Sequence, residues 1–143
     1  MLQRIQSIFL LLGSVSCFGL FGTDLADTPT AVSESDLFAD ASFNLFDDPI
    51  LLGIVVLAGV VLLAAIFLFR NRKLQMNVVL LGVGCVGAAI GYGALEFFTD
   101  VAREAAVPDF GIALPVLATV MGILAYTNIG KDERLVRSAD RLR

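Results

Sequence analysis

The sequence predicts an all-α integral membrane protein, a four-helix bundle formed by one domain over residues 1–143. Four apolar stretches predict its helices, at residues 5–22, 49–69, 76–96 and 110–129. Each has about the ~20 residues that a helix needs to cross a ~30 Å hydrocarbon core. Hydrophobic residues make up 57% of the chain and charged residues 17%, which leaves too few polar positions to cover a soluble domain.

The first stretch, residues 5–22, follows Arg4 and is expected to be a retained membrane crossing. The alternative is a cleaved signal peptide, because small residues at Gly13, Ser14 and Ser16 lie within and after an apolar core. The charge pattern does not separate these alternatives, since cleavage leaves three spans with the same orientation of the C-terminus.

The outer loop, residues 23–48, carries seven acidic residues and no Lys or Arg. Its first half is polar, contains Pro29 and is expected to be mobile. Its second half places Leu37, Phe38 and further apolar residues among acids. This pattern fits either an amphipathic turn or two, resting on the membrane or on the outer ends of the helices, or a solvated loop, and both alternatives stay open.

The second stretch, residues 49–69, begins at Asp48-Pro49, which is typical of a helix N-cap followed by proline at the first helical position. The short turn that follows, residues 70–73, is Arg-Asn-Arg-Lys. We expect Asp109 to cap the fourth helix in the same way, and Thr99 or Asp100 to cap one short helical turn before it.

The third stretch, residues 76–96, carries small residues on one helical face, and the fourth offers a matching set. The helix-packing candidates are Gly84, Gly87, Gly91 and Ala94 on the third and Ala118 and Gly122 on the fourth. Lipid provides no hydrophobic force between helices, so small residues favour association by allowing close backbone approach. We expect packing of the third span against the fourth within the bundle. The alternative is a seam with a second copy or another subunit.

Glu96 is the one carboxylate within the apolar register of a span, which makes it a candidate transport acid. Its place near the end of the third stretch instead favours an interfacial acid that reaches water or pairs with Arg103. Pro115 is expected to kink the fourth helix and free the carbonyl of Gly111. A small transporter or channel protomer using Glu96 and this kink is the alternative function.

The tail, residues 130–143, is expected to continue the fourth helix, with basic and acidic residues interleaved around an apolar stripe. Interleaved signs favour specific pairing over binding to a uniformly anionic lipid surface. The candidate docking surface combines the N-terminus with this tail: Arg4, Glu133, Arg137, Asp140 and Arg141. The alternative is a tail that serves only as a positive topology anchor.

The basic segments lie at the N-terminus, the 70–73 turn and the tail, whereas both remaining connections are acidic. Because short cytoplasmic loops are enriched in Lys and Arg, we expect a multi-pass protein of a bacterial inner membrane. Both of its termini would then be cytoplasmic.

The composition favours no catalytic chemistry. The chain contains no histidine, and its two cysteines, Cys17 and Cys85, lie singly in apolar stretches. We therefore expect no catalytic, cofactor-binding or metal-binding residues, no nucleic-acid partner and no enzyme activity. The expected function is a non-enzymatic accessory or scaffold subunit, whose partners are the bilayer and other membrane subunits or a second copy.

The two ends of the chain resemble a known family. Residues 1–12, MLQRIQSIFLLL, and residues 131–143, KDERLVRSADRLR, are similar to the ends of the family catalogued as domain of unknown function 4293. That family consists of small four-span membrane proteins of Bacteroidota. The resemblance implies a four-span fold with a retained first span, and it implies no reaction.

Overall fold

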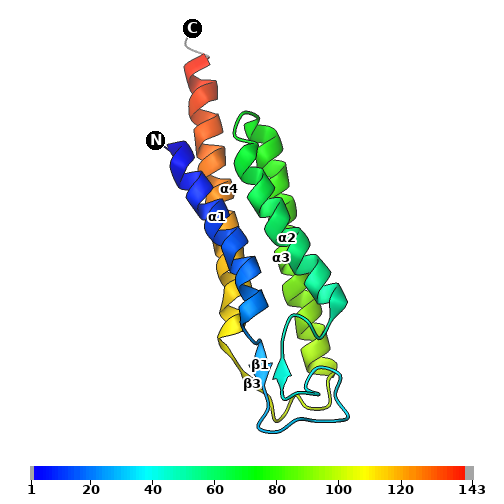
Figure 1. The fold of residues 1–143 in the computed structure, drawn as a ribbon. Helices are drawn as coiled ribbons and strands as arrows, with labels where there is room; N and C mark the ends of the chain where they lie inside the picture. The colour runs from blue at the N-terminus through cyan, green and yellow to red at the C-terminus, as the bar shows by residue number, and fades with distance from the viewer. Residues whose placement is uncertain (1, 141–143) are drawn as a thin grey trace.

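The computed structural model describes the backbone of residues 2–140 and the side chains of residues 5–136 and 138. Its main elements are four helices: α1 (Leu2–Gly19), α2 (Pro49–Phe67), α3 (Arg72–Thr99) and α4 (Ala113–Asp140). The helices run up and down in an elongated bundle, with both termini and the α2–α3 turn at one end (Figure 1). We call this the tail end and the opposite end the loop end.

The four helices form a ring. α1 packs against α2 and α4, and α3 packs against the same two helices. α1 and α3 are therefore diagonal, as are α2 and α4. This arrangement confirms that the third and fourth helices pack together, and it also makes α1 and α4 neighbours, which the sequence left open. The predicted tail helix is also confirmed, because α4 continues through Gly130 to Asp140.

The loop end contains a small sheet that the all-α prediction missed. Three two-residue strands, β1 (Ala26–Asp27), β2 (Ser42–Phe43) and β3 (Val107–Pro108), pair antiparallel in the order β2-β1-β3. The sheet joins the 23–48 loop to the α3–α4 connection. The described loop contains no helix, but Leu37, Phe38, Phe43 and Leu45 are buried. Phe38 packs against Phe97 at the end of α3, as expected for a segment that rests on the outer ends of the helices.

Side chains cap the starts of α2 and α3, and the first of these caps was predicted. Asp48 Oδ1 accepts hydrogen bonds from the amides of Ile50 and Leu51 at 2.6 and 3.0 Å, which confirms the predicted cap. Asn71 caps α3 through Leu74. Asp109 precedes the 3₁₀ turn η2 (Phe110–Ile112) without a side-chain cap bond, so that prediction was wrong. The predicted short helical turn is confirmed in part. α3 extends to Thr99 and residues 101–105 form turns instead of a helix, but Asp100 Oδ1 accepts from the Ala102 amide at 2.7 Å, as predicted for a cap.

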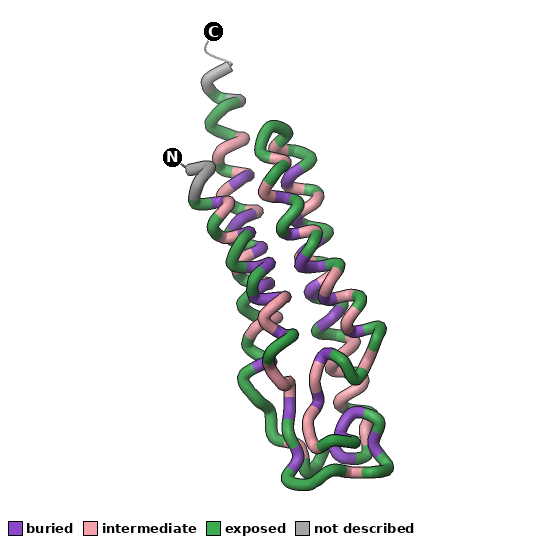
Figure 2. The backbone as a smooth tube through the Cα atoms, in the orientation of Figure 1, coloured by how far each residue is buried: buried purple, intermediate pink, exposed green. Residues whose placement is uncertain are grey.

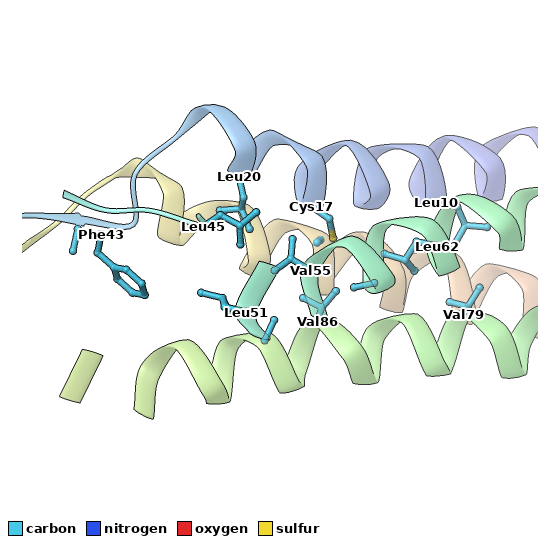
Figure 3. Close-up of a cluster of buried hydrophobic side chains, with 14 of the residues drawn as sticks. Leu10, Cys17, Leu20, Phe43, Leu45, Leu51, Val55, Leu62, Val79 and Val86 are labelled. Carbon is cyan, nitrogen blue, oxygen red and sulfur yellow. The ribbon is translucent and has the colours of Figure 1, made fainter. Parts of the chain in front are cut away.

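The core lies along the bundle axis, with exposed residues on the outer faces of the helices (Figure 2). Leu10, Leu62 and Val79 meet in its tail-end half (Figure 3). Two polar bonds cross between helices there. Ser14 Oγ donates to the Gly59 carbonyl at 2.9 Å, and Gln75 Nε2 donates to the Ala65 carbonyl at 2.9 Å.

Apolar side chains also cover the outside of the bundle. Leu57, Leu81, Leu95 and Val116 each keep more than half of their surface exposed. The four helices are long and apolar enough to cross a membrane, over residues 5–22, 49–67, 72–99 and 110–136. The apolar segments predicted from the sequence therefore correspond to the observed helices, with α3 longer at both ends.

Candidate interaction surfaces and a cavity at the loop end

The glycines of α3 divide between two faces. Gly82 faces the bundle, and a Cβ built on it would lie 2.8 Å from Leu62 Cδ2. Gly84, Gly87 and Gly91 are exposed, and a Cβ on any of them would meet nothing outside its own stretch of helix within 4 Å. The prediction that these three residues pack α3 against α4 was wrong, because α2 and α4 lie against the other face of α3.

Of the remaining helix-packing candidates, two are buried between helices as predicted and one is half-buried. Ala118 is fully buried, and Gly122 is buried against the side chain of Val83 on α3. Gly122 therefore permits the close contact between α3 and α4 that the sequence predicted, but through Val83 instead of the glycine stripe. Ala94 is half-buried and lines a cavity described below.

Beside the exposed glycines lies an open groove on the outer surface of α3. Its lining residues are Asn77, Leu80, Leu81, Gly84, Cys85 and Ala88. Gly84 belongs to both features, so the groove and the stripe of Gly84, Gly87 and Gly91 are continuous along one helix. We call this combined feature the outer α3 face.

Glu96 and Pro115 do not form a common site. Glu96 lies in the last turn of α3 at the loop end and is half-buried. Arg103 Nη1 donates to the carbonyl of Phe98 at 2.7 Å, and no ion pair joins Arg103 to Glu96 among the described side chains. Pro115 is the third residue of α4, where a missing N–H costs no intrahelical bond, so the predicted kink is wrong.

The tail end carries an ion pair that the sequence reasoning missed. Arg72 at the start of α3 lies 3.5 Å from the carboxylate of Asp132 on α4. Asp132 thus binds within the chain, whereas the proposed docking surface treated the tail acids as available to a partner. The side chains of Arg4, Arg137 and Asp140, and all of Arg141, lie outside the described residues. Glu133 is half-buried and also interacts within the structure.

The loop end is held together by contacts that join distant segments. Ser35 Oγ donates to Asp100 Oδ2 at 2.7 Å, linking the 23–48 loop to the end of α3. The Phe38 ring packs edge-on against Phe43 and Phe97, at centroid distances of 6.1 and 6.4 Å. The first half of the loop, which contains Ser35, was expected to be mobile, and no local pattern indicated Asp100 or Phe97 as partners of this loop.

The pKa values of two acidic residues at this end, Asp24 and Asp48, are shifted in opposite directions. Burial raises the pKa of Asp24, and the neighbouring carboxylates of Asp27, Asp109 and Asp40 raise it further. Burial also acts to raise the pKa of Asp48. Hydrogen bonds from the Leu51 amide, the Tyr92 hydroxyl and the Ile50 amide outweigh it, and the pKa is lowered. The Tyr92 hydroxyl donates to Asp48 Oδ2 at 2.8 Å and so connects α3 to the start of α2.

Directly beneath this loop layer lies an apolar cavity of about 180 Å³. Side chains from all four helical segments and from the loop surround it, and every lining residue is apolar or glycine. Leu20, Leu45, Leu51 and Val55 form its wall nearest the bundle axis (Figure 3). No pattern in the sequence indicated this cavity, because its lining comes from segments that only the tertiary fold brings together.

Among the described residues, no group of three or more Cys, Asp or Glu is arranged to hold a metal ion. The observed features are surfaces and an apolar cavity on a four-helix bundle whose helices could each cross a membrane. The class of protein is therefore a four-helix bundle with helices long and apolar enough to cross a membrane. The chain belongs to the family described as domain of unknown function (DUF4293), whose model matches residues 2–142. Comparison with curated proteins and with solved structures finds no significant match.

Proposed function

We propose that this chain is a non-enzymatic accessory or scaffold subunit that crosses a bacterial inner membrane four times. Its termini face the cytoplasm, as the basic tail end and the acidic loop end favour. The observation that carries the subunit role is the outer α3 face, where Gly84, Gly87 and Gly91 are exposed. An origin in Bacteroidota, which the resembling termini imply, belongs to the same proposal.

The physical argument is that close helix packing inside this bundle uses other glycines. The ring of Phe18 packs against Gly59, the side chain of Leu62 against Gly82, and the side chain of Val83 against Gly122. The exposed stripe of Gly84, Gly87 and Gly91 therefore takes no part in helix packing within one chain. In lipid, a stripe of small residues lets a second helix approach closely and gain dispersion and Cα–H···O contacts. The fitting occupant is a transmembrane helix, from another subunit or from a second copy.

The test compares Gly87→Leu and Gly91→Leu with Gly53→Leu after gentle detergent extraction. Gly53 on α2 is a matched control, because it too is exposed and a Cβ there meets nothing within 4 Å. We expect the two α3 variants to lose co-purified subunits, or to shift from dimer to monomer in native mass spectrometry. The control should behave as the parent.

All three variants should keep the monomer fold, because none places atoms against a neighbouring element. Identical partners and identical mass for parent, stripe variants and control would refute a role for the outer α3 face. The transporter alternative predicts instead that Glu96→Gln abolishes a host phenotype at normal protein levels, and nothing in the site geometry favours that outcome.

A further inference from the structure

The cavity at the loop end is too apolar to be a water site. A buried water requires about two to four polar partners, and the cavity lining presents no polar side chain. Its volume of about 180 Å³ resembles that of an engineered apolar cavity, ~150 Å³, that stays dry and binds benzene. Well-packed interiors contain few voids of this size, so an apolar occupant would restore lost contacts.

The cavity opens sideways instead of toward the loop. Leu45 and Phe43 of the loop layer are almost fully buried and close it at the loop end. The most exposed lining residues lie on α3, on α4 and on η2 directly before α4: Ile90 is 40% exposed, Val116 53% and Ile112 46%. A ligand would therefore enter between α3 and α4, from whatever surrounds the apolar face of the bundle.

The depth of the cavity matches one leaflet of a bilayer. Its lining on α3 extends from Ala89 to Phe97, a rise of ~12 Å, close to half of a ~30 Å hydrocarbon core. Arg103 lies at the loop end, where its guanidinium donates to the carbonyl of Phe98, the residue that follows the lining residue Phe97. No carboxylate forms an ion pair with Arg103 among the described side chains, which leaves its charge for an external anion.

We propose that this cavity binds one acyl chain of a phospholipid in the leaflet at the loop end, with the phosphate near Arg103. The small side chains of Gly93 and Ala94 on α3 make room for the chain, and Val116 borders its entry. This inference rests on the membrane placement proposed above and not on the subunit role.

The test uses protein reconstituted in phospholipid vesicles with two probes that carry the same photoreactive acyl chain, a phosphatidylglycerol and a diacylglycerol. Mass spectrometry of the cross-linked peptides locates the chain. For the parent we expect excess cross-linking at cavity residues such as Ala94 and Leu51. Ala94→Phe fills the cavity and should lower this yield about tenfold, the effect of a ~1.4 kcal/mol loss in binding.

Ala64→Phe is the matched control, because Ala64 on α2 is exposed and lies outside both the cavity and the outer α3 face. It should leave the yield at Ala94 unchanged. Should Ala94→Phe fail to fold, Val116→Trp obstructs the entry from an exposed position and should reduce the yield as well. Arg103→Gln should lower labelling by the phosphatidylglycerol and leave diacylglycerol labelling unaltered.

Equal labelling along all exposed helix faces, or yields at the cavity that neither Ala94→Phe nor Val116→Trp changes, would overturn the acyl-chain site. Equal labelling by both probes, in the parent and in Arg103→Gln, would refute the contact between Arg103 and the phosphate. It would therefore also refute the assignment of the ligand as a phospholipid. A separate carbonate wash of native membranes tests the placement itself. If the protein washes off, it is not an integral membrane protein, and the proposed membrane placement is refuted. If the protein stays in the membrane but shows no cavity labelling, only the acyl-chain site is refuted.

Discussion

Single glycines decide where this chain can pack closely. Gly111 at the loop end is the most constrained, because a Cβ there would collide with the backbone carbonyl of Asp24. The Gly111 amide also donates to that carbonyl, at 3.1 Å. Gly87 has no such neighbour. The same residue type therefore has a structural role at one position and leaves an open surface at another.

We predict that Gly111→Ala lowers the free energy of unfolding by about 1–3 kcal/mol, the usual cost of overpacking against atoms that cannot rotate away. Thermal unfolding in detergent measures the effect, and Gly87→Ala is the control. If Gly111→Ala melts with the parent, the contact between Asp24 and η2 is looser than the structure indicates.

Asp48 provides a second prediction at the residue scale. Its carboxylate holds two amides of α2 and the Tyr92 hydroxyl. Asp48→Ala should cost about 0.5–2 kcal/mol at pH 7, as for other lost N-caps. Because the folded-state pKa is lowered, this stabilisation is present above the unfolded value of 3.8 and is lost as the pH falls through the folded value.

The measurement is the difference in unfolding free energy between parent and Asp48→Ala as a function of pH. The difference should shrink below about pH 4, near the reference pKa of an aspartate. Taking a difference removes the opposite contribution of Asp24, whose raised pKa makes protonation favour the folded state. A difference that is constant down to pH 2 would contradict the cap as a charged group.

At the scale of elements, α1 is an integral member of the ring. It packs against α2 and α4, Ser14 donates to the Gly59 carbonyl, and the Phe18 ring fills the space above Gly59. Its removal would expose buried faces of two helices. These contacts favour the retained crossing over the signal-peptide alternative.

We predict that the intact mass of the purified protein includes residues 5–22. A mature chain beginning near Thr23 would contradict this prediction. The variant Ser14→Ala tests one contact of α1. Its intact mass should still include residues 5–22 and its fold should be unchanged, but the unfolding free energy should fall by about 1 kcal/mol for one lost buried hydrogen bond.

At the scale of the whole molecule, charge divides the two ends. The tail end carries the 70–73 turn and the basic tail, joined by the Arg72–Asp132 pair, whereas acids dominate the loop end. We predict that reporters fused after residue 143 and within the 70–73 turn report the cytoplasm. A reporter inserted near Pro29 should report the opposite side. Any reversal of this pattern would refute the orientation.

Neutralising Arg70, Arg72 and Lys73 together should weaken this orientation and produce mixed reporter signals, because Lys and Arg near span ends set topology. The replacement Asp132→Asn is the matched control. It removes the ion pair but no positive charge, so topology should stay unchanged. The pair is partly buried but still reaches solvent, so its loss should cost about 1 kcal/mol or less.

The four apolar helices, the α2 cap at Asp48 and the helical tail could be predicted from the sequence, because each depends on residues close together in the chain. A run of about 20 apolar residues is constrained by membrane thickness alone. A cap needs only an acid followed by the first turn of a helix.

The faces of the helices could not be predicted in this way. α2 and α3 are apolar around their whole circumference, so hydrophobicity does not distinguish the side toward the core from the side toward the surroundings. The positions of α2 and α4 around α3 make that distinction, which is why Gly82 is buried and Gly87 is exposed. The two-residue strands and the apolar cavity likewise depend on contacts between segments far apart in the chain, for which a local pattern carries no information.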